Sequence, residues 1–167
     1  VRNLIQSEDY QKVFQGIELS TDSKAAGRWN TNKRGDYFAI GVGGAVTGKG
    51  ADILIIDDPH SEQEAQLGQY NPDVYDKVYE WFTSGPRQRL QPGGAIILVM
   101  TRWSKRDLTG QLLKVMQERE GADEWELIQL PAIMPSGNPL WGEFWSLPEL
   151  DSLKAELPVS KWNAQYQ

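Results

Sequence analysis

The chain has 167 residues, of which 40% are hydrophobic and 24% charged, enough for one globular domain with a sizeable core. Its 23 acidic and 17 basic side chains give a formal net charge of -6, which argues against a polycationic nucleic-acid coat. Without cysteine, disulfides and Cys-ligated zinc are excluded, and the single histidine, His60, cannot build a His-rich metal site. We expect any metal to be held by oxygen. No apolar run approaches the roughly 20 residues of a membrane span, so a soluble protein without membrane association is expected.

Three apolar segments predict strands in the first hundred residues. Residues 37–42 (YFAIGV) form the first of these and run into a glycine-rich loop. Residues 53–56 (ILII) and 95–100 (AIILVM) are apolar without interruption. Such runs are typical of strands that are buried on both faces, as in the centre of a parallel sheet.

Helix signals lie between the two uninterrupted strands. Ser61 and Glu64 have the spacing of a capping box. Asn71 followed by Pro72 predicts an N-cap with proline at the first helical position. The predicted order is therefore strand, helix, strand.

The same alternation continues after residue 100. Ser104 and Asp107 again have capping-box spacing, ahead of an apolar helical stripe over 108–116. Residues 124–134 predict a further strand broken by a proline, and 146–157 predict a last helix. This alternation predicts an α/β fold, a mainly parallel sheet with helices on both faces.

Two adjacent carboxylates, Asp57 and Asp58, follow the first buried strand. Ligands of open α/β sheets bind at the carboxyl ends of the strands, so the pair is well placed for chemistry. One carboxylate can hold Mg²⁺ while the other positions a water, the division used in nucleotide hydrolysis. The alternative is a pair of solvated acids that cap a turn. His60, beside the pair, is expected to be a turn residue rather than a ligand.

Thr101 and Arg102 follow the second buried strand, at the end that matches Asp57 and Asp58. A hydroxyl and a forked cation at this rim are suited to sensing a γ-phosphate. The alternative is that Arg102 forms a simple salt bridge with Asp57 or Asp58.

The segment 43–50 (GGAVTGKG) has the G-x-x-x-x-G-K pattern of a Walker A loop but ends in Gly50 where Ser or Thr is needed. A Walker A loop also opens a helix, whereas this segment leads into a predicted strand. We therefore interpret it as a tight turn that projects Lys49.

Several segments together resemble the large subunit of tailed-phage DNA-packaging terminases. That family couples an N-terminal P-loop ATPase domain of the ASCE class to a nuclease domain. The resemblance implies a P-loop NTPase-like fold that is incomplete here, because the Walker A segment is absent. The similarity extends over about 125 residues, through segments 41–59, 78–90, 97–113, 130–141 and 162–167.

The resemblance also implies roles for individual residues. Asp57 would be the Walker B magnesium ligand, and Asp58, a second candidate ligand, would stand where many relatives have a catalytic Glu. Thr101 and Arg102 would belong to the segment that binds nucleotide and couples hydrolysis to movement. Lys49 would lie in a turn that matches a Gly-Arg-Gly turn common in relatives, near where some terminases carry an arginine finger, although lysine lacks the bidentate fork.

The function implied is an ATP- and Mg²⁺-dependent motor subunit that translocates viral double-stranded DNA into a procapsid. The implied partners are that DNA, the portal protein, the small terminase subunit and further copies in a ring, in the host cytoplasm. We expect residues 1–157 to be the C-terminal part of the ATPase domain and 158–167 to begin a linker to a nuclease domain. A fragment of this kind is expected to be inactive by itself.

Three alternatives remain open at this point. Another ASCE ATPase, such as a helicase, would use the same site. A catalytically silent interaction module would keep the fold and dock a partner. A two-metal nuclease would need Asp57, Asp58 and Glu62, and only one strand offers carboxylates.

Overall fold

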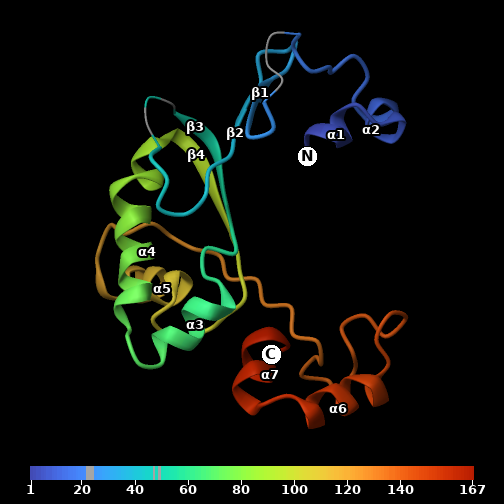
Figure 1. Ribbon diagram of the computed structural model, residues 1–167, viewed down its shortest axis with the longest axis vertical. Helices are drawn as coiled ribbons and strands as arrows, with labels where there is room; N and C mark the ends of the chain where they lie inside the picture. Colours follow the sequence, from blue (N-terminus) through green and yellow to red (C-terminus); the bar gives the residue numbers. More distant parts are fainter. Residues whose placement is uncertain (22–24, 47, 49) are drawn as a thin grey trace. The chain divides into compact units, whose positions relative to one another are not determined.

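The computed structural model describes residues 1–21, 25–46, 48 and 50–167, which divide into two compact units, Val1–Thr47 and Gly48–Gln167 (Figure 1). The smaller unit contains helices α1 (Arg2–Ile5) and α2 (Glu8–Val13). It also contains an antiparallel pair of strands, β1 (Arg28–Asn30) and β2 (Asp36–Phe38). The strand predicted over 37–42 is therefore too long, because it ends at Phe38. Its partner β1 offers only three residues for pairing.

The larger unit is built on two parallel strands, β3 (Ala51–Asp57) and β4 (Leu90–Val99). The chain between them forms α3 (Glu62–Gly68), α4 (Asp73–Ser84) and the 3-10 helix η1 (Pro86–Arg89). The predicted order of strand, helix and parallel strand is confirmed, and this part of the protein is α/β. Three helices follow β4: α5 (Leu108–Glu118), α6 (Leu147–Glu156) and α7 (Val159–Gln165).

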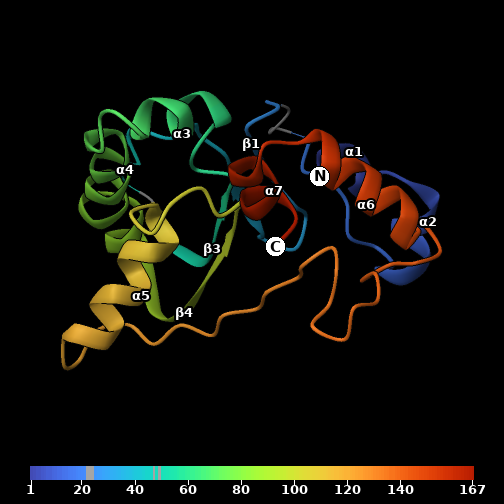
Figure 2. The same ribbon diagram turned by 90° about the horizontal axis from the view of Figure 1, so that it is seen from below.

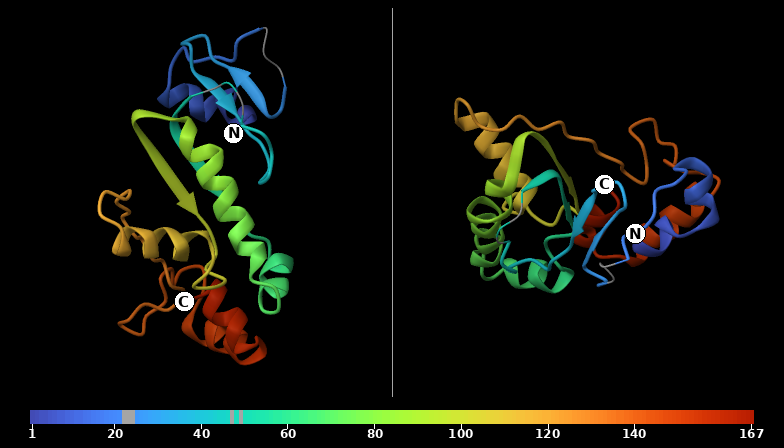
Figure 3. Two further views of the ribbon diagram at one scale, coloured as in Figure 1. Left: turned by 90° about the vertical axis from the view of Figure 1, so that its left-hand side faces the viewer. Right: turned by 90° about the horizontal axis from the view of Figure 1, so that it is seen from above.

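The core of this unit lies on one face of the two strands. Helix α4 runs back along β4 (Figure 3), and α4 and α5 lie on the same side of the strands (Figure 2). Alternate strand residues, Leu54 and Ile56 on β3 and Ile96 and Leu98 on β4, face these helices. The buried cluster consists of Ile56, Val78, Phe82, Leu108 and Leu112.

The other face of β3 and β4 is exposed, so the expectation of helices on both faces is wrong for the described chain. Ile53 and Ile55 on β3 expose 62% and 63% of their surface, and Ile97 and Val99 on β4 expose 47% and 55%. An uninterrupted apolar run shows that both faces can be buried, but it does not supply the second covering layer.

The capping box predicted at Ser61 forms, and α6 begins with a second one. In α3, the Glu64 amide donates to Ser61 Oγ at 3.2 Å while the Ser61 amide donates to Glu64 Oε2 at 2.8 Å. In α6, Ser146 and Glu149 form the same reciprocal pair. Both satisfy backbone donors that a helix start otherwise leaves unpaired.

Two other helix starts are displaced from their predicted positions. Helix α4 begins at Asp73, and Asn71 Oδ1 accepts the Asp73 amide at 3.2 Å from two residues upstream. Helix α5 begins at Leu108 with Asp107 as its N-cap, so Asp107 is not the third helical residue of a helix capped by Ser104. The physical reason is that the Asp107 carboxylate itself accepts the Gly110 amide, at 2.8 Å.

The strand expected at 124–134 does not form in the described chain. Residues 124–130 run as an extended segment that belongs to neither sheet (Figure 2). Ile133 makes only an isolated bridge with Pro139. A strand needs a neighbouring backbone to pair with, and a groove described below separates this segment from β4.

The C-terminal helix is anchored within the larger unit. Trp162 of α7 is 2% exposed, and the carbonyl oxygen of Tyr166 accepts the Ala132 amide at 2.8 Å. Helix length and hydropathy across the described residues give no candidate for a membrane-spanning helix.

Candidate functional site

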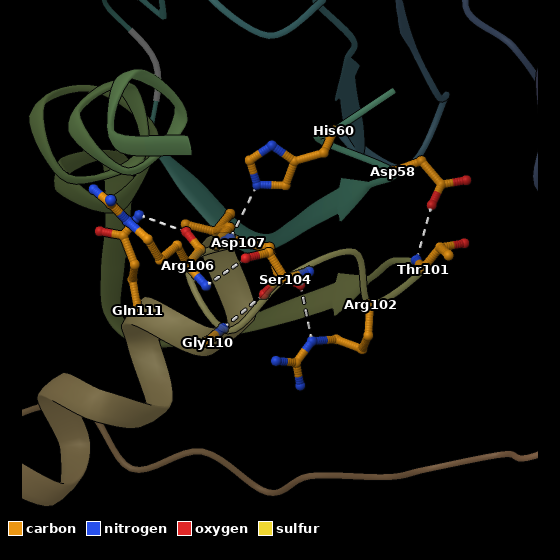
Figure 4. Close-up of polar contacts among 10 residues, drawn as sticks. Asp58, His60, Thr101, Arg102, Ser104, Arg106, Asp107, Gly110 and Gln111 are labelled. Carbon is orange, nitrogen blue, oxygen red and sulfur yellow. Dashed lines mark hydrogen bonds and ion pairs between the residues drawn. The ribbon is translucent and has the colours of Figure 1, made fainter. Parts of the chain in front are cut away.

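The ends of β3 and β4 bring two of the predicted site segments together. Asp57 is in register with Val99, the last residue of β4. The Asp58 amide then donates to the Val99 carbonyl oxygen at 2.9 Å, and Asp58 Oδ1 accepts the Thr101 amide at 3.3 Å (Figure 4). Because parallel strands end at the same edge, the two exposed carboxylates and Thr101 share one rim.

Asp58 has a backbone conformation that is uncommon for residues with a side chain. Its φ is 41°, in the left-handed region that aspartate and asparagine tolerate better than other non-glycine residues. Such a conformation costs on the order of 1 kcal/mol and persists only where surrounding contacts hold it. Here the bonds to Val99 and Thr101 hold it, so the carboxylate has a defined position at the strand end.

Arg102 forms its ion pair with Asp107, which corrects the alternative that it pairs with Asp57 or Asp58. The Nε atom of Arg102 donates to Asp107 Oδ2 at 3.1 Å, and the Asp107 side chain is fully buried. Figure 4 shows the terminal nitrogens of Arg102 directed away from Asp107. The guanidinium is thus held at one nitrogen and presents the rest of its fork.

Asp107 also organises the loop between β4 and α5. Besides Arg102, its Oδ2 accepts the Ser104 amide at 3.1 Å, while Oδ1 caps the helix at Gly110. The spacing of Ser104 and Asp107 signalled a helix start near here. Nothing in that spacing showed that Asp107 would be buried or would position Arg102.

His60 connects the turn after Asp58 to the first turn of α5. It is 3% exposed, its Nε2 accepts the Leu108 amide at 3.0 Å, and its ring meets Tyr75 edge-on with centroids 5.2 Å apart. The sequence predicted only a turn residue at His60 and not the hydrogen bond that it accepts from Leu108. The available signal was a lone histidine directly after Asp-Asp-Pro.

Burial lowers the pKa of His60 from its ordinary value of 6.5, and the negative charges of Asp107 and Glu64 partly oppose the shift. Protonation of Nε2 would remove the acceptor for the Leu108 amide. Because the unfolded chain takes up this proton at a higher pH than the folded chain, we expect the free energy of unfolding to fall as pH drops below about 6.5. The limit for one proton is about 1.4 kcal/mol per pH unit.

Urea denaturation across this pH range measures the effect. His60→Gln, which keeps a side-chain acceptor but does not titrate, is expected to flatten the dependence near pH 6. An unchanged slope in the variant would assign the dependence to other groups.

A groove opens beside these residues along the outer edge of β4. Its volume is about 780 Å³. It is lined by Ile96–Val99 of β4, by parts of α5 and α7, by residues 124–130, and by Asp58, Met100, Thr101, Arg102 and Gln167. We call it the β4 groove. The candidate site therefore lies at one end of a larger apolar depression.

The described residues contain no group of three or more histidine, aspartate or glutamate side chains placed to hold a metal. Asp57 and Asp58 supply two carboxylates, and Glu62 is engaged elsewhere through an ion pair with Lys161 at 2.5 Å. That hydrogen-bonded pair lowers the pKa of Glu62. Glu62 therefore does not complete the three-carboxylate set that a two-metal nuclease needs. Lys49 lies outside the described residues, and its role stays a prediction.

Comparisons of the chain with protein-family models, with curated proteins and with solved structures found no match. The site must therefore be interpreted from its own geometry. That geometry bonds Asp58 to Thr101, places Asp57 beside them at the end of β3, and holds Arg102 nearby through Asp107.

Proposed function

We propose that this chain belongs to an ATP-hydrolysing motor subunit that moves viral double-stranded DNA into a procapsid, with its β3–β4 rim handling magnesium and nucleotide. The observation that carries the nucleotide part is the placement of Asp57, Asp58 and Thr101 at the shared carboxyl end of two parallel strands. A P-loop NTPase-like fold of the ASCE class is part of this proposal. The resemblance to terminases adds the proposed partners, which are double-stranded DNA, a portal protein, a small terminase subunit and further copies in a ring.

The donor set fits Mg²⁺, which prefers oxygen ligands and usually keeps several waters. Asp57 and Asp58 supply carboxylate oxygens, and Thr101 adds a hydroxyl. Two carboxylates make a weak site alone, because Mg²⁺ in nucleotide sites also takes phosphate oxygens. When bound, the metal would neutralise charge on the phosphates.

We assign the other proposed roles to three residues of the chain. Asp57, as the last residue of β3, is placed to hold the metal directly or through a water. Asp58, fixed by Thr101, is placed to orient a water and accept its proton. Arg102, held at Nε by Asp107, offers its terminal nitrogens to an anionic group.

Titration with Mg²⁺ and a non-hydrolysable ATP analogue, followed by backbone amide NMR, tests the nucleotide part. We expect weak but saturable shifts at Asp57, Asp58 and Thr101, up to about 10 mM ligand, that require both components. Asp57→Asn is expected to abolish them. Asp52→Asn, an exposed acid near the opposite end of β3, is the matched control and should leave them unchanged. Absence of shifts, or shifts that survive Asp57→Asn, would favour a silent interaction module.

A further inference from the structure

Residues 101–107, which we call the rim loop, are joined at both ends to the turn that follows β3. At the start of the loop, the Thr101 amide donates to Asp58 Oδ1 at 3.3 Å. Just after its end, the Leu108 amide donates to His60 Nε2 at 3.0 Å (Figure 4). Because the two acceptors are two positions apart in the chain, one short turn holds both ends of the rim loop.

The two hydrogen bonds differ in their surroundings. The bond between Asp58 and Thr101 is exposed to solvent and is the longer one. The bond between His60 and Leu108 is buried, since the two residues are 3% and 0% exposed. A hydrogen bond shielded from water is stronger than an exposed one, because the local dielectric constant is lower. Asp58 can therefore give up its bond to a ligand more readily than His60 can.

His60 is a costly residue at its position unless the bond to Leu108 is needed. Since Nε2 accepts the Leu108 amide, the neutral ring carries its proton on Nδ1. That buried nitrogen has no hydrogen-bond partner among the described residues. An unpaired buried donor lowers stability, and an apolar side chain of similar volume would avoid it. Only the acceptor that His60 brings to the start of α5 distinguishes it from such a side chain.

The buried end of the rim loop leads directly to Arg102. Asp107, the last residue before α5, is buried and accepts both Arg102 Nε and the Ser104 amide at 3.1 Å. A shift of the start of α5 would therefore move the carboxylate that holds the guanidinium. An ion pair between Arg106 and Asp76 also restrains the loop, but both side chains are about half exposed, so it contributes little.

We propose that His60 is a positioning residue that holds Arg102 in place through the Leu108 amide. When the Asp58 carboxylate leaves the Thr101 amide to engage a ligand, the buried bond keeps the rim loop closed. Arg102 then stays beside the carboxylates of the rim. The identity of the ligand, magnesium with nucleotide, rests on the proposed function, whereas the bond that closes the loop is a property of the free chain.

Hydrogen exchange, measured by NMR on the full chain without nucleotide, tests this role. His60→Leu removes the acceptor at similar volume, and His60→Gln keeps an acceptor near the position of Nε2. In His60→Leu, we expect exchange of the Ser104 amide and of the Arg102 Nε–H to become about tenfold faster, as for loss of one buried hydrogen bond. His60→Gln should restore both rates. If His60→Leu fails to fold, His60→Asn replaces it, because its shorter amide does not reach Leu108.

Two control variants separate this role from a general loss of stability. Ser61→Ala removes the N-cap of α3, at the position next to His60, and should leave exchange within the rim loop unchanged. Asp58→Ala removes the exposed bond and should speed exchange of the Thr101 amide without releasing Arg102. Equal rates in His60→Leu and His60→Gln, an equal increase in Ser61→Ala, or release of Arg102 by Asp58→Ala would overturn the proposal.

A titration with Mg²⁺ and a non-hydrolysable ATP analogue gives a second readout. Because Arg102 offers its terminal nitrogens to an anion, His60→Leu should bind the analogue about threefold more weakly or worse, and His60→Gln should match the parent chain. Equal affinity of His60→Leu and the parent would overturn the positioning role. Absence of binding to the parent would overturn the proposed function alone, and the exchange rates would then decide whether His60 holds Arg102.

Discussion

Asp107→Ala is expected to lower the free energy of unfolding by about 2–4 kcal/mol. The substitution removes the N-cap of α5, which by itself costs about 1 kcal/mol. It also leaves the Ser104 amide without its acceptor and Arg102 without its carboxylate. Arg102 is one-third exposed, so water partly compensates for that loss and keeps the total below the cost of breaking a fully buried pair.

Urea denaturation at neutral pH measures the change, and two further variants separate its causes. Asp107→Ser keeps a good N-cap but cannot form the ion pair, so it should recover part of the stability. Asp76→Ala removes an exposed carboxylate from its ion pair with Arg106 and should cost less than about 1 kcal/mol. If Asp107→Ala cost no more than Asp76→Ala, Asp107 would not organise this loop.

The strands and the shared rim were predictable because their signals are local. Uninterrupted apolar runs fix where β3 and β4 lie, and a parallel arrangement follows from the helices between them. Asp57 and Thr101 then fall at one edge by chain order alone. The capping box at Ser61 was equally local, because it involves residues three positions apart.

Features that depend on distant contacts were not predictable in this way. The bond between His60 and Leu108 joins residues 48 positions apart, and the ion pair of Arg102 depends on which carboxylate becomes buried. Residues 124–130 have a strand-like pattern, but a strand forms only if a partner backbone reaches them. The exposed face of β3 and β4 has the same cause, because apolar residues do not supply their own covering layer.

Substitution of Asp57 or Asp58 is expected to have the largest effect on activity. The two substitutions should impair different steps of nucleotide binding and hydrolysis. In the natural full-length protein, Asp57→Asn removes the carboxylate that we propose as a magnesium ligand. It should therefore weaken magnesium–nucleotide binding and hydrolysis together. Nucleotide affinity and turnover, measured side by side, distinguish this result from that expected for Asp58.

Asp58→Asn is expected to retain nucleotide affinity while turnover falls by roughly 10²–10⁴, the range for loss of a positioned acid or base. Asparagine keeps a side-chain oxygen that can accept the Thr101 amide, and it tolerates the φ of 41° that this position requires. The fold of the strand end should therefore survive, and only the capacity to take a proton from water is lost. Asp58→Ala removes that bond and fits the left-handed region poorly, so it should also lower stability by about 1 kcal/mol or more. Turnover of Asp58→Asn at the parent rate would show that Asp58 is a turn residue held by Thr101 and not the base.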